Sequence, residues 1–368
     1  MRIGIDGREL TGHATGVGRY VENLCDVWSS EAFANSHSIV VYTHTPIADQ
    51  IPRDRVTGAN ISYVTLPGEG NIWWEQTRLA FAINRDNIDV FFGPGYSLPL
   101  GTTVPSVVTL HDLSFFRRPD WFGLKEGLRR RTLTQTAVQI ANRIITVSEF
   151  SKQELVDLLG VPTSRIQVIY NGVTPFTRET VDNRDTRRLI LYVGSIFNRR
   201  HIPTLITAFS HVHRVLDDAE LVIVGPNRTY PHQNLDLLAK QEGVEDHVEF
   251  SDYVTEDRLR DLYRKARVFV FLSEYEGFGM TPLEALTAGV PAIVGDTQVA
   301  REVYRNGARY VNVNDANEVA AAILKLLSDT SLHNEHVEIA KSSVSRYTWT
   351  ATAKQTMETL ETTAGYQS

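Results

Sequence analysis

Residues 268–294 constrain the fold of this chain more than any other stretch, because they predict a strand, a glycine turn, a short helix and a second strand in immediate succession. Val268–Leu272 is a continuous apolar run, which is typical of a parallel strand covered on both faces. Gly277 and Gly279 allow a turn in which the backbone approaches a ligand closely. Pro291–Val294 predicts the next strand. The stretch therefore indicates a parallel α/β sheet with a ligand site at one edge.

The helix inside this stretch presents its N-terminus to that edge. Thr281 is expected as the N-cap and Pro282 as the first helical residue, with Gly289 at the end. Unpaired N–H groups and the helix dipole favour an anion at such a terminus. Glu276 and Glu284 flank the site, with seven residues between them. Thr281 and Glu284 also fit a capping box, in which Glu284 would serve the helix and not a ligand.

This stretch resembles the donor-site motif of the retaining GT-B glycosyltransferases of family 4, the glycosyl transferases group 1. In that family two glutamates separated by seven residues enclose Gly-Phe-Gly. The matching residues are Glu276, Gly277, Phe278, Gly279, Pro282, Glu284, Ala285, Gly289 and Pro291. The resemblance implies that Glu276 faces the donor sugar and that Glu284 binds the ribose hydroxyls. It assigns the diphosphate and sugar to the intervening backbone, namely Gly277, Phe278, Gly279, Met280 and Thr281.

Composition narrows the class of protein. The 368 residues are enough for two domains, 42% are hydrophobic, and the net charge of −7 shows no nucleic-acid footprint. The single cysteine, Cys25, excludes an internal disulfide framework and fits a reducing cytoplasm. The start of the chain lacks the apolar core of a signal peptide, and no apolar run approaches the ~20 residues of a membrane span. We expect a cytoplasmic protein, with peripheral membrane contact if its acceptor is lipid-linked.

The N-terminal half begins with a βα unit. Arg2–Asp6 predicts a strand and Val17–Trp28 a helix, as in a doubly wound sheet that binds ligands at its carboxyl edge. A dinucleotide fingerprint would need a third glycine where Val21 stands, which argues against a nicotinamide cofactor. The resemblance instead places Gly16 and Gly18 in the first loop of the acceptor domain, near the donor phosphates. Alternatively, these glycines have only a structural role, in forming a turn.

A histidine follows another buried strand of this half. Val104–Leu110 predicts the strand, and His111 and Asp112 come directly after it. Adjacent residues of a strand point to opposite faces, so the two make a poor metal pair. The resemblance implies that His111 contacts the transferred sugar. Alternatively, His111 only satisfies loop carbonyls.

Basic residues appear in two places. Arg129–Arg131 lies on a long predicted helix and is either a solvated face or a patch for an acidic acceptor or a lipid phosphate. Arg199 and Arg200 follow the strand Leu189–Val193, where the family carries a basic pair that reaches the diphosphate. The chain departs from the family here, because Ser195 stands where an arginine often follows the glycine, and Arg200 takes the lysine position. Either arginine can bind phosphate bidentately, or both are solvated loop charges.

The expected fold is α/β of the GT-B type, with two doubly wound Rossmann-like domains facing across a cleft. Residues 1–173 form the acceptor-binding domain, residues 174–188 a polar linker, and residues 189–347 the donor-binding domain. Residues 348–368 form a final helix that the resemblance sends back onto the first domain. Within the donor domain, the family's base contacts correspond to the backbone near Tyr253 and Val254.

The resulting hypothesis is a metal-independent hexosyltransferase in polysaccharide or glycoconjugate biosynthesis, with His111, Glu276 and Arg200 in catalytic roles. The donor is a nucleotide-diphosphate sugar, with GDP-mannose favoured by resemblance to mannosyl-type members, and the acceptor is a glycan or a lipid-linked saccharide. No Asp-x-Asp occurs in the sequence, so the metal clamp of the other major transferase fold has no ligands. We expect no cofactor and no nucleic-acid partner. The alternatives are a nucleotide-sugar-binding protein or degenerate subunit without turnover, and a nicotinamide-dependent dehydrogenase.

Overall fold

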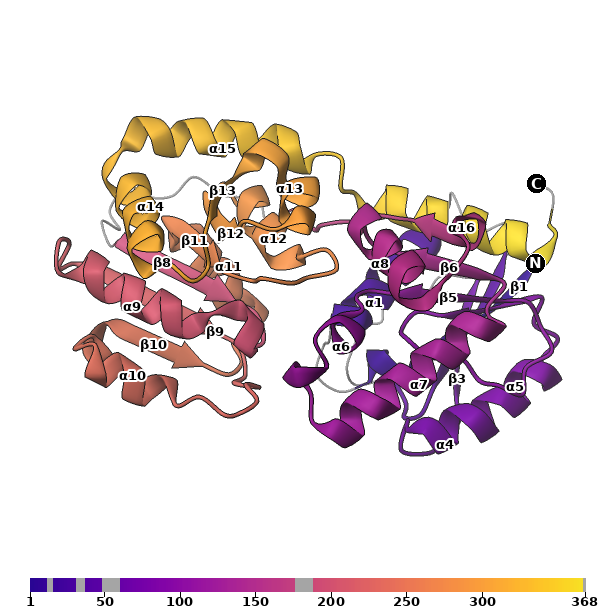
Figure 1. Ribbon diagram of the computed structural model, residues 1–368. Helices are drawn as coiled ribbons and strands as arrows, with labels where there is room; N and C mark the ends of the chain where they lie inside the picture. The colour runs from indigo at the N-terminus through magenta and orange to yellow at the C-terminus, as the bar shows by residue number, and fades with distance from the viewer. Residues whose placement is uncertain (12–15, 31–36, 48–59, 176–187, 367–368) are drawn as a thin grey trace. The chain divides into compact units, whose positions relative to one another are not determined.

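The computed structural model describes residues 1–11, 16–30, 37–47, 60–175 and 188–366, which form two compact units (Figure 1). Unit 1 comprises Met1–Pro119, Leu124–Gly172 and Tyr347–Ser368, and unit 2 comprises Asp120–Gly123 and Val173–Arg346. The expected linker, residues 174–188, lies almost wholly outside the described residues. Asp120–Gly123 groups with unit 2, whereas the sequence analysis assigned it to the first domain.

Unit 1 is built on a parallel sheet that, within the described residues, has seven strands in the order β3-β2-β1-β4-β5-β6-β7. The strands are β1 (Arg2–Asp6), β2 (Ser38–Thr43), β3 (Ile61–Thr65), β4 (Val90–Gly93), β5 (Ser106–Leu110), β6 (Arg143–Thr146) and β7 (Ile166–Val168). Nearly all residues of β1, β2, β4, β5 and β6 are buried. Such continuous apolar runs are typical of parallel strands covered on both faces.

Helices cover this sheet. The longer ones are α1 (Gly16–Trp28), α7 (Leu124–Ile140), α8 (Glu149–Leu159) and α16 (Trp349–Ala364), and the shorter are α4 (Ile72–Trp74), α5 (Ala80–Arg85) and α6 (Ser114–Arg117). The remaining turns are η1 (Arg8–Leu10), η3 (Pro119–Trp121), η4 (Thr163–Arg165) and the π-helical segment η2 (Glu75–Leu79), which joins α4 to α5. Ser148 caps α8, because its side chain accepts a hydrogen bond from the Ser151 amide over 3.0 Å.

The C-terminal helix α16 is part of unit 1. The indole Nε1 of Trp28 in α1 donates to the Ala353 carbonyl over 3.1 Å. Thr352 Oγ1 donates to the Tyr170 carbonyl over 2.8 Å. His37 Nε2 lies 2.9 Å from Glu361 Oε1. These contacts attach α16 to α1, to the segment after β7 and to the residue before β2.

Unit 2 repeats the architecture with a parallel sheet in the order β10-β9-β8-β11-β12-β13, again counted over the described part of the chain. Its strands are β8 (Arg188–Val193), β9 (Ala219–Val224), β10 (Val248–Ser251), β11 (Val268–Phe271), β12 (Ala292–Gly295) and β13 (Ala308–Val311). Every residue of β11 and β12 is buried. The expected class, α/β with two doubly wound parallel sheets, is confirmed.

The helices of unit 2 are α9 (Ile202–His213), α10 (Leu235–Gln241), α11 (Glu256–Lys265), α12 (Met280–Thr287), α13 (Gln298–Tyr304), α14 (Ala316–Ser328) and α15 (Thr330–Val344), with the short turns η5 (Asn198–Arg200), η6 (Glu245–His247) and η7 (Arg305–Gly307). None of the helices in the described ranges is both long and apolar enough to cross a membrane.

Candidate active site

The strand order of unit 2 reverses between β8 and β11, because β9 and β10 lie beside β8 whereas β12 and β13 lie beside β11. In open α/β sheets, ligands bind outside the carboxyl ends of the strands at such a switch point. The loop after β8 carries Arg200, and the loop after β11 carries Glu276. Nε of Arg200 donates to Oε1 of Glu276 over 2.9 Å. Two residues that the sequence analysis singled out separately therefore meet at the ligand edge.

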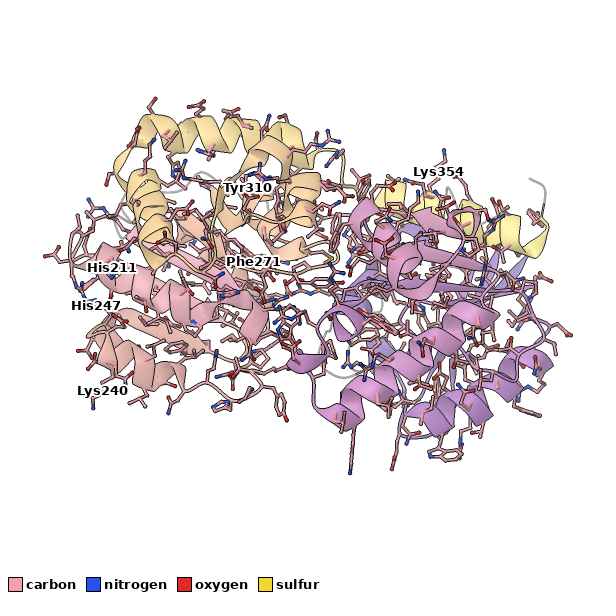
Figure 2. The ribbon with its side chains drawn as sticks, viewed as in Figure 1. His211, Lys240, His247, Phe271, Tyr310 and Lys354 are labelled. Carbon is pink, nitrogen blue, oxygen red and sulfur yellow. The ribbon has the colours of Figure 1, made fainter. Side chains whose placement is uncertain are left out.

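Arg200 is held in place on several sides. Its Nη1 donates to the Ser195 carbonyl over 2.7 Å. Its Cζ lies 4.9 Å from the ring centroid of Phe271, labelled in Figure 2, and 5.6 Å from that of Phe197. Burial acts to lower the pKa of Arg200, but the Glu276 carboxylate and the Tyr192 hydroxyl together outweigh it and keep that pKa above its ordinary value. The guanidinium is therefore a fixed positive charge beside the glycine turn.

Arg199 has different surroundings. Its side chain is buried, with Cζ 4.5 Å from the ring centroid of Phe197 and 5.8 Å from that of Trp121, which belongs to unit 2. Within the described residues its Nε has no hydrogen-bond partner. Its carbonyl accepts from the Glu274 amide over 2.9 Å. Arg199 thus stacks on aromatic rings, and Arg200 is the arginine that contacts Glu276.

The glycine turn is shaped by Gly279. This residue has φ 84°, in the left-handed region, and an added Cβ would lie 2.1 Å from the Tyr304 hydroxyl oxygen. That hydroxyl donates to the Gly279 carbonyl over 2.8 Å. Glu276 is anchored at the other end of the turn, where its Oε1 accepts from Ser273 Oγ over 2.9 Å. Gly277 and the buried Phe278 lie between these two anchors.

The prediction for the start of α12 is wrong. The helix begins at Met280 with Gly279 as N-cap, so Thr281 and Pro282 lie inside its first turn. The left-handed backbone at Gly279 allows the helix to start earlier than a threonine cap would. Within the described part of the chain, Thr281 Oγ1 is buried without a hydrogen-bond partner. The first helical amides therefore follow directly on the glycine turn.

The capping-box interpretation of Glu284 fails with it, since Glu284 lies in the second turn of α12. Its side chain is buried, and its Oε2 accepts a hydrogen bond from the Tyr263 hydroxyl over 3.1 Å. The carboxylate is thus held by a side chain of α11 and not by the cap of its own helix.

Tyr253 and Val254 follow β10, the strand at one edge of the sheet of unit 2. The Tyr253 side chain is exposed. These two residues lie on the β8 side of the switch point, two strands away from the strand that precedes Arg200.

His111 directly follows β5 in unit 1. Its Nε2 lies 2.8 Å from the Pro94 carbonyl oxygen, which can only accept, so we assign the proton to Nε2 and the acceptor role to Nδ1. Burial lowers the pKa of His111, and the Pro94 contact and the Asp112 charge offset this only in part. The imidazole is therefore neutral at pH 7. The contact with the Pro94 carbonyl is the one expected if His111 only satisfies loop carbonyls. A ligand could instead be bound through Nδ1.

Gly16 and Gly18 lie in the first turn of α1, which corrects their placement in a loop. An added Cβ at Gly16 would meet nothing within 4 Å, so no neighbour among the described residues requires glycine there. Gly18 is buried within the helix. The amphipathic face of α1, with Tyr20 and Leu24 buried, explains why the helix extends back to these residues.

Two side chains that hold Arg200 were not predicted from the sequence, namely Phe197 and Phe271. Their only signal was their place beside the basic loop and at the end of β11. The ion pair of Arg8 and Glu75 in unit 1 was not predicted either. Across the described ranges, no group of three or more histidine, cysteine, aspartate or glutamate side chains is arranged to hold a metal ion.

Two family models match this chain in sequence. Residues 14–175 match the model described as Glycosyltransferase Family 4, and residues 173–343 match the model described as Glycosyl transferases group 1. The second match contains the whole glycine turn and both glutamates.

Curated relatives include two mannosyltransferases. The chain is 31% identical over 216 residues to O-antigen chain mannosyltransferase RfbU of Salmonella typhimurium, and the aligned region covers 59% of each protein. It is 26% identical over 290 residues to O-antigen chain mannosyltransferase B of Escherichia coli, and the aligned region covers 76% of each protein. The chain thus spans less than two thirds of the first of these relatives.

The fold has close structural counterparts. HepE of Anabaena, solved in complex with UDP-glucose, matches with a TM-score of 0.76 and 16% sequence identity, over 98% of this chain and 99% of that chain. An identity this low shows the fold alone. The two family models and the two Rossmann-type sheets together show that the chain belongs to the group 1 glycosyltransferases and has the GT-B fold.

Proposed function

We propose that the protein transfers mannose from GDP-mannose to a hydroxyl of a glycan or lipid-linked saccharide, with retention of the anomeric configuration. The observation that carries this proposal is the Arg200–Glu276 pair at the β8/β11 switch point, beside a glycine turn that leads into a helix N-terminus. The mannosyltransferase relatives support the choice of sugar. A UDP-sugar is the competing donor, although the similarity of this chain to HepE, solved with UDP-glucose, is evidence for the fold alone.

In this proposal different groups of unit 2 bind different parts of the donor. Arg200 and the first amides of α12 take the diphosphate, because a guanidinium and a helix N-terminus both favour phosphate oxygens. Glu276 faces the sugar and Glu284 accepts from the ribose hydroxyls. The base meets the backbone at Tyr253 and Val254. Arg199 supports the loop through its aromatic contacts.

The remaining assignments concern unit 1. His111 accepts a hydrogen bond from a hydroxyl of the transferred sugar through Nδ1, which is consistent with its neutral imidazole. Gly16 and Gly18, in the first turn of α1, approach the donor phosphates.

The proposed reaction breaks the bond between the anomeric carbon and the diphosphate oxygen and forms one from that carbon to the acceptor oxygen. The acceptor proton leaves with the diphosphate. Negative charge therefore develops on the departing diphosphate, and preorganised positive groups stabilise it. We propose that Arg200 and the amide groups do this without a divalent metal or a cofactor.

We further propose that the reaction occurs in the cytoplasm, at the membrane surface when the acceptor is lipid-linked. The lone Cys25 is buried and unpaired, as suits a reducing compartment. Unit 1 exposes Trp73 on α4, Phe81 on α5 and Leu124 on α7. Sedimentation with anionic phosphatidylglycerol vesicles tests this. Trp73→Ala and Leu124→Ala should reduce the bound fraction, and equal binding by all forms would contradict the surface contact.

A calorimetric titration of nucleoside diphosphates tests the donor assignment. We expect GDP to bind more tightly than UDP or ADP, and Glu284→Gln to weaken the binding. Tighter binding of UDP than of GDP would contradict GDP-mannose as the donor and favour a UDP-sugar. Absence of binding by all three would contradict a nucleotide-sugar site in unit 2.

A further inference from the structure

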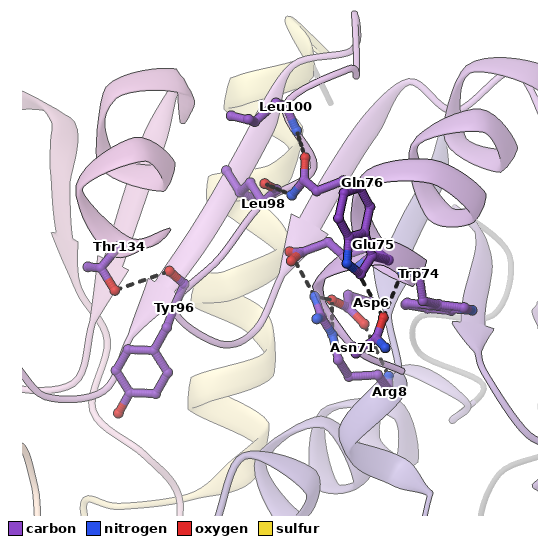
Figure 3. A network of polar contacts seen from close by, with 11 residues as sticks. Asp6, Arg8, Asn71, Trp74, Glu75, Gln76, Tyr96, Leu98, Leu100 and Thr134 are labelled. Atoms are coloured by element: carbon purple, nitrogen blue, oxygen red, sulfur yellow. Dashed lines mark hydrogen bonds and ion pairs between the residues drawn. The ribbon is translucent and has the colours of Figure 1, made fainter. Parts of the chain in front are cut away.

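A second network of charges lies in unit 1 (Figure 3). Asp6 ends β1, Arg8 lies in the turn that follows, and Glu75 begins η2. Nε of Arg8 donates to Oδ2 of Asp6 over 2.8 Å, and Nη2 of Arg8 lies 2.8 Å from Oε1 of Glu75. We call Asp6, Arg8 and Glu75 the Arg8 cluster. Its Arg8 guanidinium also lies over Trp74, with Cζ 5.7 Å from the ring centroid.

The Arg8 cluster lies at the switch point of its own sheet. β2 and β3 lie beside β1, whereas β5, β6 and β7 lie beyond β4, so the strand order reverses between β1 and β4. His111 follows β5, two strands away from β1. Neighbouring strands are about 4.8 Å apart, so the two strand ends are roughly 10 Å from each other. A ligand over this edge would therefore meet Arg8 and His111 at different places.

The π-helical segment η2 holds both loops that border this switch point. Glu75 contacts Arg8 in the loop after β1. The next residue, Gln76, donates from Nε2 to the Leu98 carbonyl over 3.2 Å and accepts from the Leu100 amide over 2.8 Å, both in the segment after β4. Figure 3 shows Glu75 directed toward Arg8 and Gln76 toward Leu98 and Leu100. π-Helical segments within α-helices are frequent at functional sites.

The loop after β4 shows a further sign of constraint. Tyr96 has φ 49°, a left-handed conformation that is uncommon for residues other than glycine. Its hydroxyl donates to Asp112 Oδ2 over 3.3 Å, and its carbonyl accepts from Thr134 Oγ1 over 3.3 Å. Strained backbone of this kind persists where the surroundings enforce it, and it clusters at ligand sites.

The members of the Arg8 cluster differ in how exposed their side chains are, and this indicates different roles. Glu75 is fully buried, and its Oε2 has no hydrogen-bond partner among the described residues. Burying a carboxylate beside one guanidinium costs hydration that the ion pair need not recover, so fold stability alone does not explain this residue. Asp6 is buried as well, whereas the Arg8 side chain keeps 16% of its surface exposed. Arg8 is therefore the member that can reach a ligand, and the two carboxylates fix its direction.

Charge selects the class of ligand. Two carboxylates and one guanidinium leave a surplus negative charge, which disfavours a phosphate or carboxylate. Burial first, and Arg8 next, lower the pKa of the adjacent His44, so this residue adds no positive charge at pH 7. Arg129 lies within electrostatic range of Arg8 and Glu75, and it donates two hydrogen bonds of 2.9 Å to Glu126. Arg130 shares the same Glu126 carboxylate, so this trio keeps one positive charge and brings the surroundings of Arg8 close to neutral. A neutral polyhydroxyl group fits this environment.

We propose that Arg8 binds a neutral saccharide ring of the acceptor by donating to its hydroxyl oxygens, with Asp6 and Glu75 as positioning residues. The inference rests on the proposed function, because it concerns the acceptor of that reaction. Arg8→Ala removes the donor group. Glu75→Gln keeps the shape of the side chain but removes the charge that orients Arg8. Arg8→Lys restores the charge without the planar fork. The matched control is Arg85→Ala, since Arg85 lies in the same unit, pairs with the neighbouring Asp86 over 2.7 Å and lies over the Phe81 ring.

The test is ligand-observed NMR titration of neutral methyl α-glycosides, with mannose, glucose and galactose as the sugars, in the presence of saturating GDP. We expect Arg8→Ala to weaken binding of the preferred glycoside about 10- to 150-fold, the loss typical of a hydrogen bond to a charged group. Glu75→Gln should weaken it less, Arg8→Lys should restore part of it, and Arg85→Ala should bind like the wild type. Melting temperatures of Arg8→Lys and Arg85→Ala should stay close to that of the wild type, whereas Arg8→Ala should melt lower because it leaves Asp6 and Glu75 buried without a counter-charge.

Equal glycoside binding by the wild type and Arg8→Ala would overturn the inference. Absence of glycoside binding by the wild type, or tighter binding of glucose 1-phosphate than of any neutral glycoside, would overturn the ligand class. If Glu75→Gln fails to fold, the comparison of Arg8→Ala with Arg8→Lys still decides the role of Arg8. GDP titration and hydrolysis of GDP-mannose report on the proposed function separately, because neither requires Arg8.

Discussion

Nε of Arg200 and Oε1 of Glu276 are 2.9 Å apart, although the two residues are 76 positions apart in the sequence. The contact joins the loop after β8 to the loop after β11, the two strands between which the order of the sheet reverses. Only 13% of the Arg200 side chain and 17% of the Glu276 side chain are exposed. The pair fixes a positive and a negative group side by side, and in our proposal these groups meet the diphosphate and the sugar of the donor.

Replacing Arg200 by alanine should weaken binding of the nucleoside diphosphate. The lost contact is a charge-assisted hydrogen bond worth about 1.5–3 kcal/mol, or about 10- to 150-fold in affinity. Arg200→Lys should retain part of the affinity, and Arg199→Ala should affect stability more than binding because Arg199 stacks on Phe197 and Trp121. Calorimetry on the three variants measures this. Normal affinity in Arg200→Ala together with a loss in Arg199→Ala would reverse the assignment.

Glu284→Gln separates ribose binding from a structural role. The amide can still accept from the Tyr263 hydroxyl, so the melting temperature should stay near that of the wild type. The neutral amide should bind the nucleotide less tightly by ~1 kcal/mol or more. Titration of matched ribose and 2′-deoxyribose nucleotides checks the site of the loss. Equal binding of both sugars by the wild type, unchanged in the variant, would contradict the ribose assignment, and Tyr263→Phe controls for the loss of the tyrosine contact.

His111 should confer an acid limb on the pH dependence of turnover. Its pKa is lowered by burial, so Nδ1 remains an acceptor at neutral pH, and turnover should fall only below the ordinary histidine value of about 6.5. The stabilisation linked to neutral His111 is likewise present above that value and lost as the pH falls through the folded-state pKa.

The variant His111→Ala checks this assignment. It should lower kcat with little change in nucleotide affinity or melting temperature, and it should lack the acid limb. Full activity of this variant, or an unchanged acid limb, would leave His111 with only its contact to the Pro94 carbonyl.

Turnover should survive chelation. In our proposal Arg200 and the amides of α12 neutralise the departing diphosphate, so no divalent ion is needed. Initial rates of donor consumption with and without excess EDTA measure this, after dialysis against the chelator. A loss of activity that magnesium or manganese restores would show that a metal takes part.

The strands were predictable from sequence, and the site was predictable only in part. Leu189–Val193 was expected for β8, which spans Arg188–Val193, because buried parallel strands leave unbroken apolar runs. The residues that follow such strands could be proposed as site residues from the sequence, but the side chains that they contact could not. That Arg200 and not Arg199 meets Glu276 depends on the η5 turn and on the Phe271 ring, which no local pattern encodes.

Local errors came from backbone conformations that tertiary contacts impose. The start of α12 was misplaced because the left-handed Gly279, fixed by the Tyr304 hydroxyl, replaces a side-chain cap. The π-helical segment in unit 1 was missed because its apolar pattern is that of an ordinary helix. The contact of Glu75 with Arg8 was missed because no local pattern links residues so far apart in the sequence.

The central claim is that this chain transfers a sugar from a nucleotide-diphosphate donor held at the Arg200–Glu276 pair. The measurement that tests it most directly is time-resolved ¹H NMR of GDP-mannose incubated with an acceptor mannoside and the purified protein. We predict loss of the donor anomeric signal, release of GDP and first formation of an α-linked product, with Glu276→Gln much slower than the wild type. An unchanged donor signal with GDP-mannose and with other nucleotide sugars, or equal rates for the wild type and Glu276→Gln, would contradict the claim.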